Sequence, residues 1–178
     1  MKILKWVIMV FVGLFAVVFV GAYFLPSTVS LSREVVIAAP ASKIFPHIND
    51  LKKNQVWSPW AQMDPDMKLV FSGPANGVGQ KNTWHSENSS VGTGSQEITA
   101  STLNNHVTTK LNFGEMGTAT SAWDLKKQGS NTKVIWSFET DLGNNPVMRW
   151  MGLRFDSMIG SDYEAGLAKL KTIVEAEK

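Results

Sequence analysis

The stretch GTATSAWDLKKQGSNTKVIWSFETDLGNNPVMRWMGLRFDSMIGSDYEAGLAKLKTIV, residues 117–174, decides the fold. Apolar and polar residues alternate along residues 117–126 and again along 132–141, and Gly129-Ser130-Asn131 lies between the two runs. Alternation of this kind predicts two strands of a half-buried sheet, joined by a short turn. The apolar spacing then changes from every second residue to every third or fourth, which predicts that a helix follows the strands.

The helical part begins with Asn144-Asn145-Pro146, an N-cap residue followed by proline at the first helical position. From there one apolar stripe recurs at helical spacing: Val147, Met151, Phe155, Met158, Ile159, Tyr163, Leu167, Leu170 and Val174. We expect one long amphipathic helix, bent at Gly152 or Gly160. Its stripe must be buried, and the concave face of the sheet is the only large apolar surface that the sequence offers.

The rest of the sheet is predicted upstream. A first strand covers residues 29–37, and further short strands separated by Gly-rich or polar turns cover 68–72, 80–86, 95–102 and 106–113. Close spacing of this kind is typical of an antiparallel meander. Between the first two strands, Phe45, Ile48 and Leu51 recur at three-residue steps, which predicts one or two short helices. Trp57-Ser58-Pro59-Trp60 is expected to form a turn.

The N-terminal part of the chain has a different character. Trp6 to Leu25 contains twenty residues without a charge, and at about 1.5 Å rise per residue such a helix spans the roughly 30 Å hydrocarbon core of a bilayer. Pro26 ends it, and Trp6 and Tyr23 are expected at the two interfaces. We therefore expect a single-pass anchor over residues 1–26 and one domain over residues 27–178.

The basic residues predict how this anchor is oriented. Lys2 and Lys5 precede the apolar segment, and no basic residue follows it until Arg33. The positive-inside rule then places the N-terminus in the cytoplasm and the domain on the extracytoplasmic, periplasmic side of the inner membrane. A cleaved signal peptide, with Val20 and Ala22 as the small-residue pair, stays an alternative. The uninterrupted apolar run beyond that pair favours the anchor.

Composition excludes several classes of function. The chain has no cysteine, so it has no disulfide, zinc–thiolate site or thiol nucleophile. It carries 17 basic and 15 acidic residues, but Lys2 and Lys5 belong to the N-terminal segment, and the domain is therefore neutral. No basic stripe interleaves with aromatic residues downstream, so nucleic-acid binding is not expected. We expect no cofactor, no metal and a monomer.

Several motifs identify the domain as similar to a known family. They are Val35-Val36-Ile37-Ala38-Ala39-Pro40 followed by Lys43-Ile44-Phe45; Trp57-Ser58-Pro59-Trp60; Phe71-Ser72-Gly73-Pro74 with Gly77-Val78-Gly79; Thr132-Lys133-Val134-Ile135-Trp136; and Gly160-Ser161-Asp162-Tyr163-Glu164-Ala165-Gly166-Leu167 with Leu170-Lys171. The domain resembles the START-like (SRPBCC) superfamily, in its polyketide cyclase/dehydrase-type branch. The resemblance implies an α+β helix-grip fold, in which a curved antiparallel sheet wraps around a long C-terminal helix. It covers about residues 29–176.

A helix-grip fold leaves space for an apolar pocket between sheet and helix. The candidate lining consists of large aromatic and methionine side chains: Trp57, Trp60, Trp84, Phe113, Trp123, Trp136, Phe138, Trp150, Met151, Phe155 and Met158. Packing of the core is the alternative role for each of them. Together, their bulk and the adaptable methionines favour a binding cavity. We expect Trp57 and Trp60 at its lip.

Polar residues give no catalytic set. His47, His85 and His106 lie on three separate elements, without the spacing of a metal pair. Strand parity places Asp124 and Glu139 on the opposite face from Trp123 and Trp136, which predicts that these carboxylates are solvated. The Gly-rich run 73–79 lacks the Lys-Ser/Thr of a phosphate loop, and no serine lies in Gly-x-Ser-x-Gly.

Three functional hypotheses follow. The first is a membrane-anchored domain that binds a hydrophobic small molecule or lipid in an internal cavity. The second is a cyclase, dehydratase or hydrolase, which requires an inward-facing acid or base such as His85, Glu97 or Asp124. The third is an interaction module at the membrane, which requires Trp57 and Trp60 to be exposed together as one patch.

Overall fold

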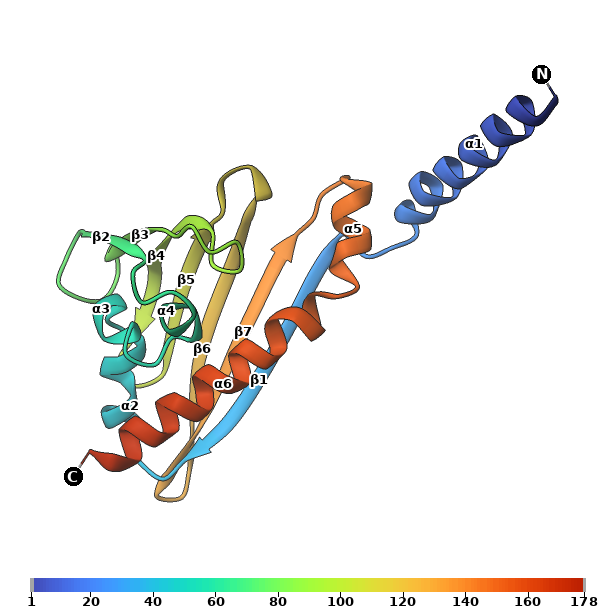
Figure 1. Cartoon of the computed structure of the whole chain (residues 1–178). Coiled ribbons are helices and arrows are strands. Elements are labelled where there is room, and N and C mark those ends of the chain that lie inside the picture. The colour runs from blue at the N-terminus through green and yellow to red at the C-terminus, as the bar shows by residue number, and fades with distance from the viewer. Residues whose placement is uncertain (1, 178) are drawn as a thin grey trace.

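A seven-stranded antiparallel sheet forms the centre of the molecule (Figure 1). The computed structural model describes residues 2–177. The strands are β1 (Thr28–Ile37), β2 (Lys68–Ser72), β3 (Lys81–His85), β4 (Thr93–Thr102), β5 (His106–Asn112), β6 (Thr118–Gln128) and β7 (Asn131–Asp141), in the spatial order β1-β7-β6-β5-β4-β3-β2. From β2 to β7 the order is a meander, as expected, and β1 pairs with β7 along its whole length.

Helices accompany this sheet, and apart from the first they lie to one side of it. They are α1 (Lys2–Tyr23), α2 (Ala41–Ile48), α3 (Leu51–Asn54), α4 (Pro59–Met63), α5 (Pro146–Gly152) and α6 (Phe155–Ala176), with a short 3-10 helix η1 at Gly114–Met116. Figure 1 shows α6 running diagonally across the curved sheet, while α2, α3 and α4 gather near its C-terminal half. This arrangement confirms the α+β helix-grip fold with a preceding apolar helix.

The expected long helix is interrupted. It is divided into α5 and α6 by Leu153 and Arg154, directly after Gly152. A Cβ at Gly152 would lie 2.6 Å from Leu142 Cδ1 and 2.9 Å from Val29 Cγ2, so only glycine allows this close approach. The first half of the predicted stripe is not buried: Val147 and Met151 are exposed. A second expectation was also wrong, because Pro59 begins the short helix α4 where we expected a turn.

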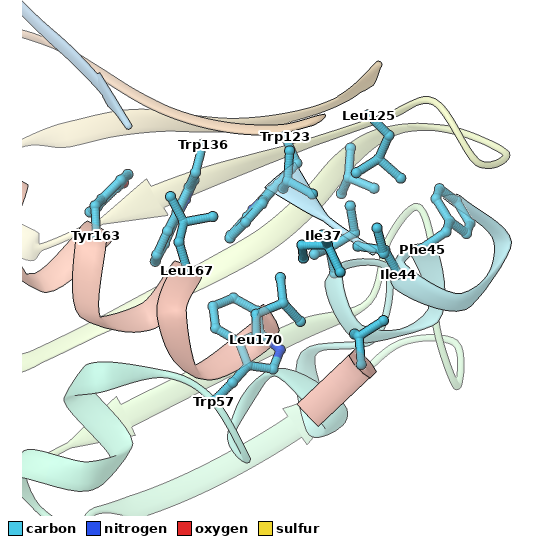
Figure 2. Close-up of a cluster of buried hydrophobic side chains, with 14 of the residues drawn as sticks. Ile37, Ile44, Phe45, Trp57, Trp123, Leu125, Trp136, Tyr163, Leu167 and Leu170 are labelled. Atoms are coloured by element: carbon cyan, nitrogen blue, oxygen red, sulfur yellow. The ribbon is translucent and has the colours of Figure 1, made fainter. Parts of the chain in front are cut away.

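The core lies between α6, α2 and the half of the sheet nearest the turn between β6 and β7. Figure 2 shows Trp57, Trp123 and Trp136 together with Leu167 and Leu170 from α6. The ring of Trp57 meets the rings of Trp123 and Trp136 edge-on, at centroid distances of 5.2 and 5.6 Å. Trp57 is fully buried, and its Nε1 donates to the backbone oxygen of His47 at 3.1 Å. It therefore lies in the core and not at the lip of a pocket, where we expected it.

Helix α1 projects away from the domain (Figure 1). Residues Ile3–Tyr23 are long and apolar enough to cross a membrane. The helix ends two residues earlier than expected, at Tyr23, and the chain passes Pro26 before it enters β1. The apolar side chains of its first five turns are exposed to solvent. A helix that is apolar on every face needs an apolar surrounding that the domain does not supply.

Candidate ligand-binding site

The face of the sheet that α6 covers carries three successive rows of side chains, each made of neighbours across the strands. The first row holds Arg33, Trp136, Trp123 and Val107. The second holds Leu31, Phe138, Ser121, Thr109 and Ile98. The third holds Thr140, Ala119, Leu111, Gln96, Asn82 and Phe71. These three rows form the inner face.

The size of the side chains changes between the rows. The first row places two stacked tryptophans at its centre, Trp123 and Trp136, 4.3 Å apart. Directly beside them the second and third rows contain Ser121, Thr109 and Ala119, which are small. Beyond the third row, Trp84 and Phe113 meet edge-on at 6.0 Å. Large aromatic side chains thus border a central area of small ones on two sides.

Burial also changes across the inner face. The first row is buried apart from Arg33, whereas Leu111, Gln96 and Phe71 of the third row are half-buried. The side chains of α4 and α6 that face this region, Trp60, Phe155 and Ile159, are half-buried as well and pack against the core. The third row is therefore less covered than the first, although Asn82 within it is buried.

Few polar groups enter this apolar surface. Asn82, in the third row, is buried, and its Oδ1 has no hydrogen-bond partner among the described residues. Gln96 is its direct neighbour on β4. A buried amide oxygen without a partner is unfavourable by roughly 1–3 kcal/mol. This oxygen is an unused acceptor buried within a largely apolar surface.

A hydrogen-bonded group marks the border between the first and second rows. Trp136 Nε1 donates to Ser121 Oγ at 2.8 Å, and the ring of Tyr163 stacks on that of Trp136 at 3.7 Å. Burial raises the pKa of the Tyr163 hydroxyl, against a smaller opposing effect of its hydrogen bond with Ser121. Tyr163 is thus a neutral phenol at physiological pH. It supplies a fixed hydroxyl and no charge.

Asp162 is an acid that sequence reasoning missed. It lies on α6 beside Tyr163 and is half-buried, and burial raises the pKa of its carboxyl group. The available signal was its helical position, three residues after Ile159 and four before Gly166, on the flank of the apolar stripe. Strand parity indicates which face a carboxylate of a strand lies on, but it does not apply to an acid on a helix.

Arg33 is a second residue that the sequence reasoning missed. It has the same strand parity as Leu31 and Val35, and it extends over Gly160 of α6. Its guanidinium donates to Asp156 Oδ1 at 2.9 Å and to Glu164 Oε1 at 2.7 Å. These contacts hold α6 on the edge strand β1. A groove of about 620 Å³, lined by Arg33, Val35, Glu164, Leu167 and Lys171 among others, runs along this contact.

The contacts that hold α6 against β1 make the stability of the fold depend on pH. The hydrogen bond from Arg33 lowers the pKa of Asp156, and the backbone N–H of Ala38 together with Lys171 lowers that of Glu175. A lowered pKa means that the folded state binds the proton less well than the unfolded state. This stabilisation is complete above the ordinary values of 3.8 and 4.5 and is lost as pH falls below them.

We therefore expect the thermal midpoint to fall between pH 6 and about pH 3, and to fall less in the double variant Asp156→Asn/Glu175→Gln. Circular dichroism at a series of pH values measures both. Glu115→Gln, which removes a carboxylate far from α6, is the control and should follow the wild type. If the thermal midpoint falls equally in the wild type and the double variant, Asp156 and Glu175 are not the source of the pH dependence.

The structure divides the predicted lining residues into three groups. Trp57, Trp123, Trp136 and Phe138 are buried side by side in the core; Trp60, Trp84, Phe113 and Phe155 are half-buried around the inner face; Met151 and Met158 are exposed, as is Trp150. Trp150 contacts α1 instead of the inner face. Phe138 also lines a second hollow, of about 480 Å³, at β1, β6 and β7. Because Trp57 is buried, it forms no common surface patch with Trp60.

The acid–base candidates named from the sequence lie away from the inner face. His85 is exposed and hydrogen-bonds Thr93 and Glu87, and Glu97 is also exposed. Asp124 pairs with His106 at 2.8 Å. Within residues 2–177, no three His, Asp or Glu side chains are grouped as metal ligands. These positions carry no acid or base into the inner face.

Comparison with known proteins agrees with this architecture. A family model described as "Polyketide cyclase / dehydrase and lipid transport" matches residues 28–175, which is the whole domain after α1. The chain belongs to this family. Membership accounts for the sheet, the covering helix α6 and the apolar inner face together, because they are the parts of a ligand-binding helix-grip domain.

Solved structures of proteins with low sequence identity to this chain have the same fold. Protein SA2116 from Staphylococcus aureus has a TM-score of 0.63 at 9% identity, over 83% of this chain and 94% of that one. Protein MLL2253 from Mesorhizobium loti has a TM-score of 0.59 at 14% identity, over 84% and 98%. Protein Ms6760 from Mycobacterium smegmatis has a TM-score of 0.57 at 14% identity, over 84% of this chain and 93% of that one. No curated protein matches the sequence.

Proposed function

We propose that this chain is a membrane-anchored domain that binds a single hydrophobic small molecule or lipid on its inner face. The observation that carries the proposal is the change from stacked tryptophans to Ser121, Thr109 and Ala119 across neighbouring strands, bordered by half-buried aromatic side chains. Ser121, Thr109 and Ala119 are each 5% exposed, so a ligand placed over them would displace the side chains that now cover them, and the aromatic borders would supply apolar contact. Family membership, in a group described by lipid transport, supports the same function.

The ligand's position follows from these contacts. Its apolar body would lie over the second and third rows, against Trp60, Trp84 and Phe155, which are half-buried. A hydroxyl or N–H group on it would donate to Asn82 Oδ1. The stacked pair Trp123–Trp136 would form one rigid border. No acid or base is needed for this function.

Helix α1 supports the membrane part of the proposal. The 21-residue segment Ile3–Tyr23, which contains one charged residue, Lys5, is long and apolar enough for one crossing, and Lys2 and Lys5 favour a cytoplasmic N-terminus with the domain on the periplasmic side. A signal sequence has the same length and composition. The intact mass of the protein extracted from membranes distinguishes the two, since cleavage after Ala22 removes the entire helix.

Native mass spectrometry of the full-length protein, released from a mild detergent, tests ligand binding. We expect one additional bound mass, and we expect Ala119→Leu to weaken its binding by about tenfold, or roughly 1.4 kcal/mol, because the larger side chain fills the central area. Ala122→Leu, on the opposite face of the same strand, is the matched control. Absence of a bound mass in the wild type, or equal occupancy in the two variants, would contradict the proposal.

A further inference from the structure

Helix α5 presents apolar side chains to the outside of the molecule. Val147 and Leu153 are each 58% exposed, and Trp150 and Met151 are 40% and 44% exposed. The helix is well formed despite this, because Asn145 Oδ1 accepts from the backbone N–H groups of Val147 and Met148. A short, capped helix with a large exposed apolar surface indicates a contact that the isolated domain does not satisfy.

The same helix touches the end of α1. Trp150 Nε1 donates to the backbone oxygen of Val18 at 3.0 Å, and its ring lies so close to Gly21 that a Cβ there would be 3.2 Å from Trp150 Cζ2. Arg149 donates to the backbone oxygen of Ala22 at 3.2 Å, with its guanidinium 6.0 Å from the ring centre of Tyr23. Figure 1 shows α5 as the part of the domain nearest to α1.

These contacts determine the depth of α5 relative to a bilayer. Tyr23 ends the apolar helix, and Val18 lies five residues before it, about 7.5 Å along the helix axis. If Tyr23 is at the interface, the Trp150 side chain that reaches Val18 enters the boundary between headgroups and acyl chains. Tryptophan is enriched at this level, and amphipathic interfacial helices lie about 5–10 Å deep there.

We propose that α5 is an interfacial helix that inserts its Val147, Trp150 and Met151 side chains, together with Leu153 directly after it, into the lipid surface beside the anchor. The proposal rests on the anchored function proposed above and adds the orientation of the domain. The bilayer is the occupant because this apolar surface is continuous with the end of α1, where Phe24 is 85% exposed. Arg154 directly follows Leu153 and is exposed, at a level where lipid phosphates are available.

Docking of α5 has a consequence for the binding site. Phe155, which borders the inner face, is only two residues after Leu153. An inserted α5 therefore holds the first turn of α6 at the lipid surface. A hydrophobic molecule dissolved in that leaflet then lies close to Phe155, at the border of the inner face.

Fluorescent labelling of the full-length chain tests this insertion. The chain has no cysteine, so Val147→Cys, Leu153→Cys, Thr83→Cys and Phe11→Cys each accept one environment-sensitive NBD label. The proteins are reconstituted into vesicles of phosphatidylcholine and phosphatidylglycerol, with or without lipids that carry a nitroxide near the top of the acyl chain or near its end. Thr83, exposed on the outer face of β3, is the matched control.

We expect labels at Val147 and Leu153 to shift to the blue and to lose most of their emission to the shallow nitroxide, while the label at Thr83 does neither. The label at Phe11 should be quenched by the deep nitroxide. Quenching at Phe11 without quenching at Val147 and Leu153 overturns the insertion of α5 and leaves the anchor intact. A label at Phe11 that is not quenched overturns the anchor and, with it, both proposals.

Discussion

Replacing Trp57 by alanine should lower the free energy of unfolding by about 3–5 kcal/mol, the largest loss that we expect from any single substitution in the domain. Trp57 is fully buried at the end of a short connection, and its ring contacts Trp123 and Trp136 edge-on. Truncation leaves a large cavity between α6, α2 and the sheet. It also leaves the backbone oxygen of His47 without the indole donor.

Chemical denaturation of the full-length protein in mild detergent, followed by near-ultraviolet circular dichroism, measures this loss. Trp60→Ala is the matched control: Trp60 is half-buried and meets Trp136 and Tyr163 at 6.0 and 6.2 Å, so its removal should destabilise the fold less. Equal losses for the two tryptophans would mean that Trp57 is not the packing centre described above.

The second large effect is expected from Gly166→Ala, which should destabilise the domain by about 1–3 kcal/mol. In an ordinary helix this change is favourable by about 1 kcal/mol. Here the new Cβ would lie 2.9 Å from Trp136 Cζ3 and 3.2 Å from Pro59 Cδ. Trp136 has little freedom to move, because it is stacked between Trp123 and Tyr163.

Gly160→Ala provides the comparison within the same helix. Its Cβ would displace the guanidinium of Arg33, the far end of a flexible side chain at a partly exposed position. The fold should tolerate this better than a collision with a stacked ring, although the contacts of Arg33 with Asp156 and Glu164 are lost. Thermal unfolding of both variants decides the point, and a more stable Gly166→Ala protein would disprove the close contact.

Much of the fold was predictable because the strands are half-buried. Alternation in residues 117–126 and 132–141 places Trp123, Leu125, Trp136 and Phe138 on one face, and the structure confirms that face as the inner one. Periodicity reports which side of an element is buried. It does not report where a helix must break, and Gly152 allows a close approach to Leu142 and Val29 that only the assembled structure defines.

The candidate site was less predictable, because it depends on how the elements pack together and not on which side of each element is buried. The list of large aromatic residues combined the core, the border of the inner face and the exposed α5, because bulk alone does not distinguish these environments. Trp57 reaches the core from a segment without periodicity. The small side chains that shape the inner face, Ser121 and Ala119, carry no signal until strand register aligns them.

The pairing of β1 with β7 also determines when the sheet can be completed during synthesis of the chain. Thr28 is the partner of Asp141, and Ile37 is the partner of Thr132, so the first strand to be synthesised waits for the last one. Contacts of such sequence separation form slowly, and until then β1 is an unpaired edge next to the apolar helix α1. The ribosome must therefore synthesise the chain as far as β7 before β1, directly after the apolar helix α1, acquires its neighbour.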